Sequence, residues 1–163
     1  NEMKKEMSEN EALYKAEAYC SMAEHCRAEV MEKLFQWGVS SEWMEGILNH
    51  LEQEGYIDQV RYAKAFVRDK YRFNQWGRVK ITQSLRQKHL ASSDIVVAME
   101  EIDEEEYFTV LEHLLAKKLP GIKAKNAYER NGKLIRFAAS RGYEMDEILR
   151  CLKRMGCDDG AFE

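Results

Sequence analysis

The chain repeats one helical pattern three times. The pattern occupies residues 34–51, 85–102 and 138–155, which align when the sequence is shifted by 51 and then by 53 residues. In this register apolar residues fall opposite one another at spacings of three and four, the period of an α-helix. The equivalent positions are Val30, Ile81 and Leu134; Met44, Ile95 and Ile148; Leu48, Met99 and Leu152; and Leu51, Ile102 and Met155. A repeat of this length indicates stacked supersecondary units.

Each repeated segment is predicted to form a helix, a short turn and a second helix. Gly38 and Gly142 lie at the turn in two of the segments, where a helix commonly ends on a left-handed glycine, and His89 takes that place in the other. Serine and acidic residues follow the turns and suit helix N-caps or first turns. One further helix is expected before each pair, at about residues 11–25, 58–74 and 103–118.

Composition favours an almost wholly helical chain. Only one proline occurs in 163 residues, and proline is costly inside helices. That residue, Pro120, opens the longest expected connection, about residues 119–127. We therefore predict an all-α fold of three tandem three-helix bundle repeats that form an elongated or curved array. The repeats are expected at residues 1–57, 58–102 and 103–163.

Several classes of protein and site are disfavoured by what the sequence lacks. No apolar run approaches the roughly 18 residues of a membrane span, and no secretory leader opens the chain, so a cytoplasmic protein is expected. No motif for a nucleophile or a phosphate loop occurs, and the four histidines are scattered. We predict a protein that is not an enzyme, with no catalytic residue, no metal and no cofactor. The cysteines are expected to be reduced, partly buried thiols: Cys20, Cys26, Cys151 and Cys157.

Charge is segregated along the chain. Residues 1–57 hold five Lys/Arg and twelve Asp/Glu, residues 58–90 hold nine Lys/Arg and two Asp, and residues 91–163 hold eleven Lys/Arg and fifteen Asp/Glu. The net charges are −7, +7 and −4, although the whole chain carries only −4. A basic middle in an acidic chain indicates an anionic partner for that part of the protein.

The cations of the basic middle are predicted to line up on two adjacent helices. Because few acidic residues lie among them, we expect contact with phosphates or with a partner's carboxylates. Phe73 and Trp76 fall between the two helices, where packing is favoured over stacking on bases. The candidate partner-binding and nucleic-acid-binding residues are Arg61, Lys64, Arg68, Arg72, Arg78, Lys80, Arg86 and Lys88.

Residues 55–99 also carry a distinctive block of sequence. It begins with glycine, two apolar residues and aspartate, continues through Arg-Tyr-Ala and Phe-Val, and passes a Trp-Gly turn to a second helix. In this block the chain resembles the RecX family of bacterial recombination regulators. The matching residues are Gly55, Asp58, Arg61, Tyr62, Ala63, Phe66, Val67, Trp76, Gly77, Ile81, Leu85 and Lys88. A weaker resemblance covers the first repeat, and the third matches mainly in its helical register.

The resemblance implies a function that the spacing of residues does not. Members of the family bind the RecA recombinase, usually as filaments on single-stranded DNA, and modulate its strand exchange and ATPase activities, most often by inhibition. The family fold is three tandem three-helix units, and its members are expected to be monomers. Single-stranded or duplex DNA is a second expected partner, through the basic second repeat. Two other readings remain: a stand-alone helix-turn-helix transcription regulator, and a helical scaffold for another protein.

Overall fold

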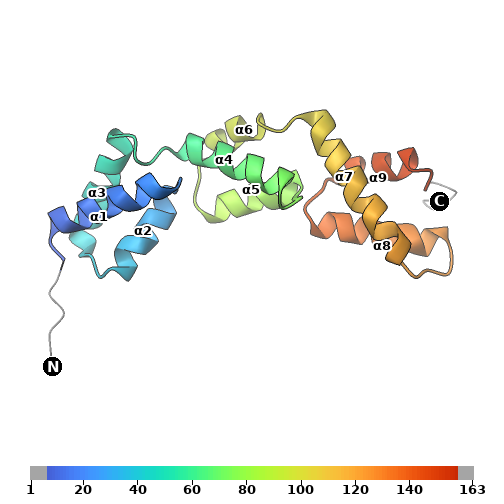
Figure 1. Cartoon of the computed structure of the whole chain (residues 1–163), viewed down its shortest axis with the longest axis horizontal. Helices are drawn as coiled ribbons and strands as arrows, with labels where there is room; N and C mark the ends of the chain where they lie inside the picture. Colours follow the sequence, from blue (N-terminus) through green and yellow to red (C-terminus); the bar gives the residue numbers. More distant parts are fainter. Residues whose placement is uncertain (1–6, 158–163) are drawn as a thin grey trace, which may run out of the picture. The chain divides into compact units, whose positions relative to one another are not determined.

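The computed structural model describes residues 7–157, and every regular element in that range is helical (Figure 1). The predicted all-α fold is thus confirmed. The elements are α1 (Glu9–Met22), α2 (Arg27–Gln36), α3 (Ser41–Gln53), α4 (Gln59–Arg72), α5 (Arg78–Gln87), α6 (Ser92–Met99), α7 (Glu104–Lys118), the 3₁₀ helix η1 (Leu119–Gly121), α8 (Ala127–Ser140) and α9 (Met145–Arg154). None of them is long and apolar enough to cross a membrane.

The chain divides into two compact units that share the middle helices. The first unit contains the chain up to Ala65 together with Arg86–Ala98, and the second contains Phe66–Leu85 together with the chain from Met99 onwards. Helices α4 and α5 therefore each contribute residues to both units. The division into three repeats at residues 57/58 and 102/103 stays a prediction from the sequence.

The first unit is built on the bundle of α1, α2 and α3. Helix α2 ends at a turn in which Gly38 takes a φ of +75°, as the repeat predicts, and the Ser40 side chain then caps α3 by accepting a hydrogen bond from the Glu42 N–H. The apolar stripe that defines the repeat faces the core. Its fully or almost fully buried members here include Val30, Leu34, Leu48 and Leu51.

The second unit contains the bundle of α7, α8 and α9. Asn126 caps α8 through its side chain, and the α8–α9 turn uses Gly142 at a φ of +93°. Pro120 lies in η1, at the start of the connection between α7 and α8. Val30, Ile81 and Leu134 occupy equivalent positions in the three repeats, and each side chain is fully buried. The positions that align in the repeated sequence pattern are therefore also the positions that are buried in the structure.

Candidate functional site

The cations of α4 follow one another at helical spacing, as predicted. We call Arg61, Lys64, Arg68 and Arg72 the α4 stripe. The Asp58 side chain accepts a hydrogen bond from the Arg61 backbone N–H at 2.9 Å, which satisfies a donor at the start of the helix. The last turn contains Arg72, a placement that the negative end of the helix dipole favours.

Arg61 is engaged by groups from outside α4. Its Nε lies 2.6 Å from the Glu24 carboxylate, and its Nη2 donates to the Gly55 carbonyl oxygen at 2.9 Å. The side chains of Arg61 and Glu24 are 45% and 36% exposed, so water screens the pair. The next cation of the stripe, Lys64, is partly buried.

Arg68 and Arg72 are paired with the acidic segment, residues 100–106. Arg68 Nη1 lies 3.3 Å from Glu101 Oε2, and Arg72 Nε lies 2.9 Å from Glu106 Oε1. Glu106 also accepts a hydrogen bond from the buried Tyr71 hydroxyl at 3.1 Å. The expectation that few acids oppose these cations was therefore wrong, because the opposing acids come from outside residues 58–90.

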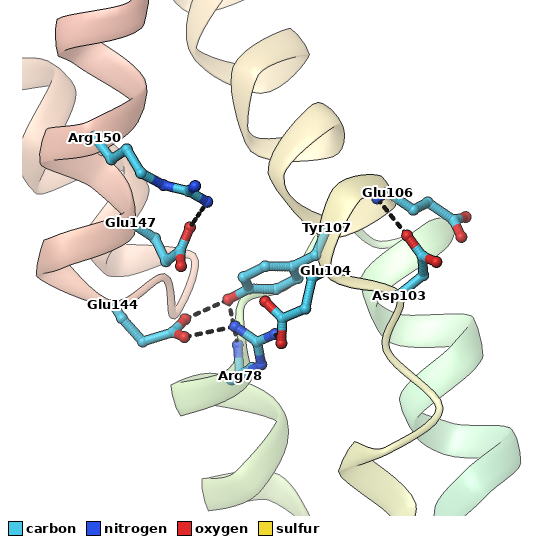
Figure 2. Close-up of polar contacts among 8 residues, drawn as sticks. All are labelled: Arg78, Asp103, Glu104, Glu106, Tyr107, Glu144, Glu147 and Arg150. Atoms are coloured by element: carbon cyan, nitrogen blue, oxygen red, sulfur yellow. Dashed lines mark hydrogen bonds and ion pairs between the residues drawn. The ribbon is translucent and has the colours of Figure 1, made fainter.

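Arg78 lies in a partly buried charged group (Figure 2). Its guanidinium lies 2.8 Å from Glu144 and 2.7 Å from Glu104, and its Cζ stands 4.1 Å from the centre of the Tyr107 ring. The Tyr107 hydroxyl accepts a hydrogen bond from the Arg78 backbone N–H at 2.9 Å and donates to Glu144. Asp103 caps the start of α7 beside them by accepting from the Glu106 N–H at 2.9 Å. We call Arg78, Glu104, Tyr107 and Glu144 the Arg78 cluster.

Burial and the neighbouring carboxylates shift the pKa values of Tyr107 and Arg78. Burial raises the pKa of Tyr107, and the hydrogen bond to Glu144 raises it further. Burial alone would lower the pKa of Arg78, but the hydrogen bond to Glu144, the charge of Glu144 and the hydrogen bond to Glu104 outweigh it and raise the pKa. The guanidinium thus stays charged and the phenol stays protonated. Both groups have hydrogen-bond partners within the cluster, so its role is to stabilise the fold.

The Arg78 cluster stands beside a contact between two stretches of backbone. The Gly77 N–H donates to the Arg141 carbonyl oxygen at 2.8 Å, and the Val79 N–H donates to the Gly142 carbonyl oxygen at 2.9 Å. These bonds satisfy donors at the start of α5 with acceptors from the α8–α9 turn. Helices α5 and α9 therefore begin at fixed places relative to each other within the second unit.

Lys88 is held by an acidic residue of the first unit. Its Nζ lies 3.4 Å from Glu29, which also accepts from the Cys26 backbone N–H at 3.2 Å and approaches His25 Nδ1 at 3.3 Å. Burial tends to raise the pKa of Glu29, but the Cys26 hydrogen bond and the charges of Lys88 and His25 lower it overall. The ion pair of Lys88 with Glu29 thus contributes to the stability of the first unit.

The loop between α4 and α5 holds an aromatic group covered by cations. The Trp76 ring centre lies 4.8 Å from Lys70 Nζ and 4.5 Å from Lys80 Nζ, and the ring meets Phe66 edge to face at 6.3 Å. Trp76 is partly buried, as packing predicts, whereas the Phe73 side chain is 80% exposed. Lys80 thus stands on an aromatic ring, as Arg78 does on Tyr107.

The structure separates the eight predicted cations into different environments. Arg61, Arg68, Arg72, Arg78 and Lys88 lie in ion pairs, Lys64 is partly buried on α4, Lys80 covers Trp76, and Arg86 is exposed near the end of α5. Sequence reasoning missed the acidic partners that lie outside residues 58–90, because 26 to 66 residues separate them from their cations along the chain. It also missed Lys70, which lies off the stripe. The run of acidic residues at 100–106 was the signal that the sequence offered.

Family comparisons place these helices among known proteins. The model of the second three-helix domain of RecX matches residues 58–99, and that of the third three-helix domain matches residues 104–152. A regulatory protein RecX of Pseudomonas fluorescens is 38% identical over 83% of this chain and 86% of its own length. A second, from Vibrio campbellii, is 35% identical over 78% of this chain and 81% of its own length.

Two solved structures share the fold. A crystal structure of the regulatory protein RecX superimposes with a TM-score of 0.82 at 23% identity, covering 89% of this chain and 73% of that one. The structure of RecX from Lactobacillus salivarius gives a TM-score of 0.81 at 18% identity, covering 91% of this chain and 96% of that one.

Proposed function

This chain belongs to the RecX family of regulatory proteins, and we propose that it regulates the RecA recombinase. In this proposal it binds the filament that RecA forms on DNA and inhibits strand exchange and ATP hydrolysis. The observation that carries the proposal is the identity of 38% with a curated family member over 86% of that protein. Inhibition would come from occupancy, since a bound chain blocks access to filament subunits and gains avidity from touching several of them.

We assign the exposed ion pairs of the α4 stripe to the contact. Arg61 and Arg72 have side chains that are 45% and 44% exposed, and their partners Glu24 and Glu106 are reached by water. Such exposed pairs contribute little to stability. A dense run of phosphates or carboxylates on a partner can therefore replace the internal carboxylate. Arg78, at 22% exposure and with two carboxylate partners, is assigned to the fold instead.

The direct experiment replaces the four cations of the α4 stripe with glutamine. ATP hydrolysis by RecA on single-stranded DNA is titrated with the parent chain and with this variant at several salt concentrations. The parent should inhibit, and the variant should require a higher concentration and show a shallower salt dependence. Lack of any effect of the parent chain on RecA contradicts the proposed function. Equal binding and equal salt dependence for parent and variant contradict only the assignment of the stripe.

A complementary experiment removes the internal competitors of the stripe. Glu24→Gln and Glu106→Gln leave hydrogen-bonding side chains but abolish their charges, which releases Arg61 and Arg72. If the stripe meets an anionic surface, the double variant should bind the filament a few-fold more tightly. Glu32→Gln with Glu42→Gln is the matched control, because it removes two exposed charges of the first unit outside these ion pairs. Equal gains for both variants would indicate a general effect of net charge.

The alternative function is that of a transcription regulator that binds duplex DNA in a sequence-specific way, and the purified parent chain can be used to test it. Helix α6 would be the second helix of a helix-turn-helix pair, and its sequence SSDIVVAM contains no Arg, Lys, Asn or Gln to read base edges. We therefore expect no sequence preference in a gel-shift assay without RecA. A strong preference for one duplex sequence would favour the transcription-regulator function over the proposed one.

A further inference from the structure

Three sulfur-containing side chains meet where α9 ends in the second unit. Cys151 lies in the helix, Met155 is its C-cap, and Cys157 follows two residues later. The Cys151 Sγ lies 3.8 Å from the Met155 Sδ, and the Cys157 Sγ lies 4.0 Å from the Met155 carbonyl oxygen. We call these three residues the sulfur cluster. The proposed regulation of RecA makes no use of it.

The backbone at the end of α9 brings the two cysteines to the same face of the helix. Gly156 takes a φ of +76°, and the Cys157 N–H then donates to the Leu152 carbonyl oxygen at 2.8 Å. In this type of helix ending, the residue after the glycine turns back and contacts a side chain near the end of the helix. Cys157 therefore returns to the face of α9 that contains Cys151. The two cysteines are 4% and 0% exposed, respectively.

Helix α8 holds Cys157 in this position. The Asn131 side-chain amide donates a hydrogen bond to the Cys157 carbonyl oxygen, and Asn131 Oδ1 accepts one from Arg130 Nε at 3.1 Å. Asn131 is fully buried, so water does not compete for these bonds. The sulfur cluster is thus fixed by two helices and by the turn that follows the second of them.

The surroundings of Cys151 keep its thiol protonated until a cation binds it. Burial raises the pKa of Cys151 to about 12, the negative charge of Glu112 adds to the rise, and the positive charge of Arg154 opposes it. Arg154 Nε lies 3.4 Å from Glu112 Oε2, so these two charges largely offset each other. A thiolate in this place therefore requires a metal ion attached to the sulfur itself.

We propose that the sulfur cluster binds one Cu(I) ion through the sulfur atoms of Cys151, Met155 and Cys157. Thiolate and thioether sulfurs are soft ligands that select Cu(I), whereas Zn²⁺ is held by cysteine, histidine and carboxylate ligands. Two sulfurs about 2.3 Å from one ion, at an angle of about 110–120°, lie about 3.8–4.0 Å apart. The Cys151 and Met155 sulfurs already have this separation. Met155 is partly exposed, so an ion can reach the cluster from its side.

Binding changes the protonation of the cluster but not the oxidation state of the metal. Each cysteine gives up its S–H proton to water and forms a bond from sulfur to Cu(I), while the Met155 thioether donates a lone pair and loses no proton. Two protons are therefore released for each ion bound. The bound group carries a net charge of −1, because two thiolates and one monovalent cation combine.

The test titrates the reduced full chain with Cu(I) in the absence of oxygen, in competition with a chromophoric Cu(I) chelator. The variant C151A/C157A is compared with C20A/C26A, which removes two buried cysteines of the first unit that have the same spacing in the sequence. We expect one ion per chain for the parent and for C20A/C26A, with equal affinity. C151A/C157A should bind about a hundredfold more weakly or worse. Thermal melting shows whether each variant is folded.

A second pair of variants tests the thioether without emptying the core. M155L keeps an apolar side chain but removes the sulfur, and it should bind Cu(I) about tenfold more weakly. M145L is the control, because Met145 lies at the other end of the same helix and is 52% exposed. Its affinity should equal that of the parent. These two variants decide the outcome if C151A/C157A does not fold.

The pH dependence counts the thiols that bind. Below the ordinary thiol pKa, release of two protons predicts that the apparent association constant rises about a hundredfold from about pH 6 to pH 7, after correction for the chelator. A rise of only about tenfold would mean that one cysteine binds, and would overturn the proposed set of ligands. Equal losses in C151A/C157A and C20A/C26A, or equal affinities for M155L and M145L, would overturn it as well. RecA is absent from every measurement, so these outcomes are separate from failure of the proposed regulation of RecA.

Discussion

The backbone of Gly77 lies directly against the backbone of Gly142, with no side chain between them. A Cβ atom at Gly77 would overlap the main chain of Gly142 and Tyr143, and a Cβ at Gly142 would overlap Lys80. Two hydrogen bonds, of 2.8 Å and 2.9 Å, join the same two segments. Both glycines are therefore required by close approach, and Gly142 also by its φ of +93°.

Alanine at position 77 should separate these two segments. We expect Gly77→Ala to lower the free energy of unfolding by about 3 kcal/mol, through overpacking and the loss of buried backbone hydrogen bonds. Gly46→Ala is the control, because position 46 lies in the interior of α3 with open space around its Cα. That change should raise stability by up to about 1 kcal/mol. Urea unfolding measures both, and a Gly77→Ala protein as stable as the parent would contradict the contact.

The pair of Arg78 and Glu144 should show a measurable coupling. Their side chains are 22% and 27% exposed, so water weakens the interaction less than at the surface. A double-mutant cycle with Arg78→Gln and Glu144→Gln should give a coupling energy of about 1–2 kcal/mol. The same cycle with Glu104→Gln should give less than about 1 kcal/mol, since Glu104 is 75% exposed. Equal couplings would mean that burial does not distinguish the two carboxylates.

The charge of Glu29 should make the first unit sensitive to acid. Its pKa is lowered in the folded chain from an ordinary value near 4.5, so the stabilisation is complete above that pH and disappears as the pH falls through the lowered pKa. At pH 7, Glu29→Gln should cost about 1–2 kcal/mol, because hydrogen bonds to a charged acceptor are lost. The difference from the parent should shrink towards zero as the pH falls through the lowered pKa of Glu29. Glu32→Gln, exposed on the same helix, is the control, and a deficit of Glu29→Gln that stays constant with pH would contradict the prediction.

The four cysteines should react slowly in the folded protein. All four are free and buried, and burial raises the pKa of Cys20 to about 11 and that of Cys151 to about 12. Because the thiolate is the reactive form, modification by a disulfide reagent at pH 8 should be roughly a hundredfold slower than in urea. The number of thiols modified is followed by absorbance, and a rapid phase of modification in the native protein would show that at least one thiol is accessible.

Much of the fold could be predicted from apolar spacing alone. Val30, Ile81 and Leu134 are equivalent in the sequence and are all fully buried, because a packed helix must place its apolar residues on one face. The turn at His89 was also recognised, and its φ of +62° shows the conformation that a glycine would adopt more readily. Ser92 lies in the first turn of α6 rather than at its N-cap, since Ala91 provides the first carbonyl acceptor.

The candidate site was less predictable, because charge pairing depends on distant parts of the chain. The spacing of Arg61, Arg68 and Arg72 on one helix face was correct, but their carboxylate partners lie 33 to 37 residues away in sequence. Nothing local indicates which glutamate a given arginine meets.

The contact between Gly77 and Gly142 positions two helices through backbone atoms, independently of the side chains on the surface around it. Its hydrogen bonds join main-chain atoms, which every residue type possesses, so exchanging neighbouring side chains leaves the bonds in place. Substitutions at positions such as Lys80 and Arg141 can therefore change what the surface attracts without changing where α5 and α9 begin. The surface charges of this part of the protein could therefore be redesigned, provided that Gly77 and Gly142 are kept, because neither position has room for a Cβ atom.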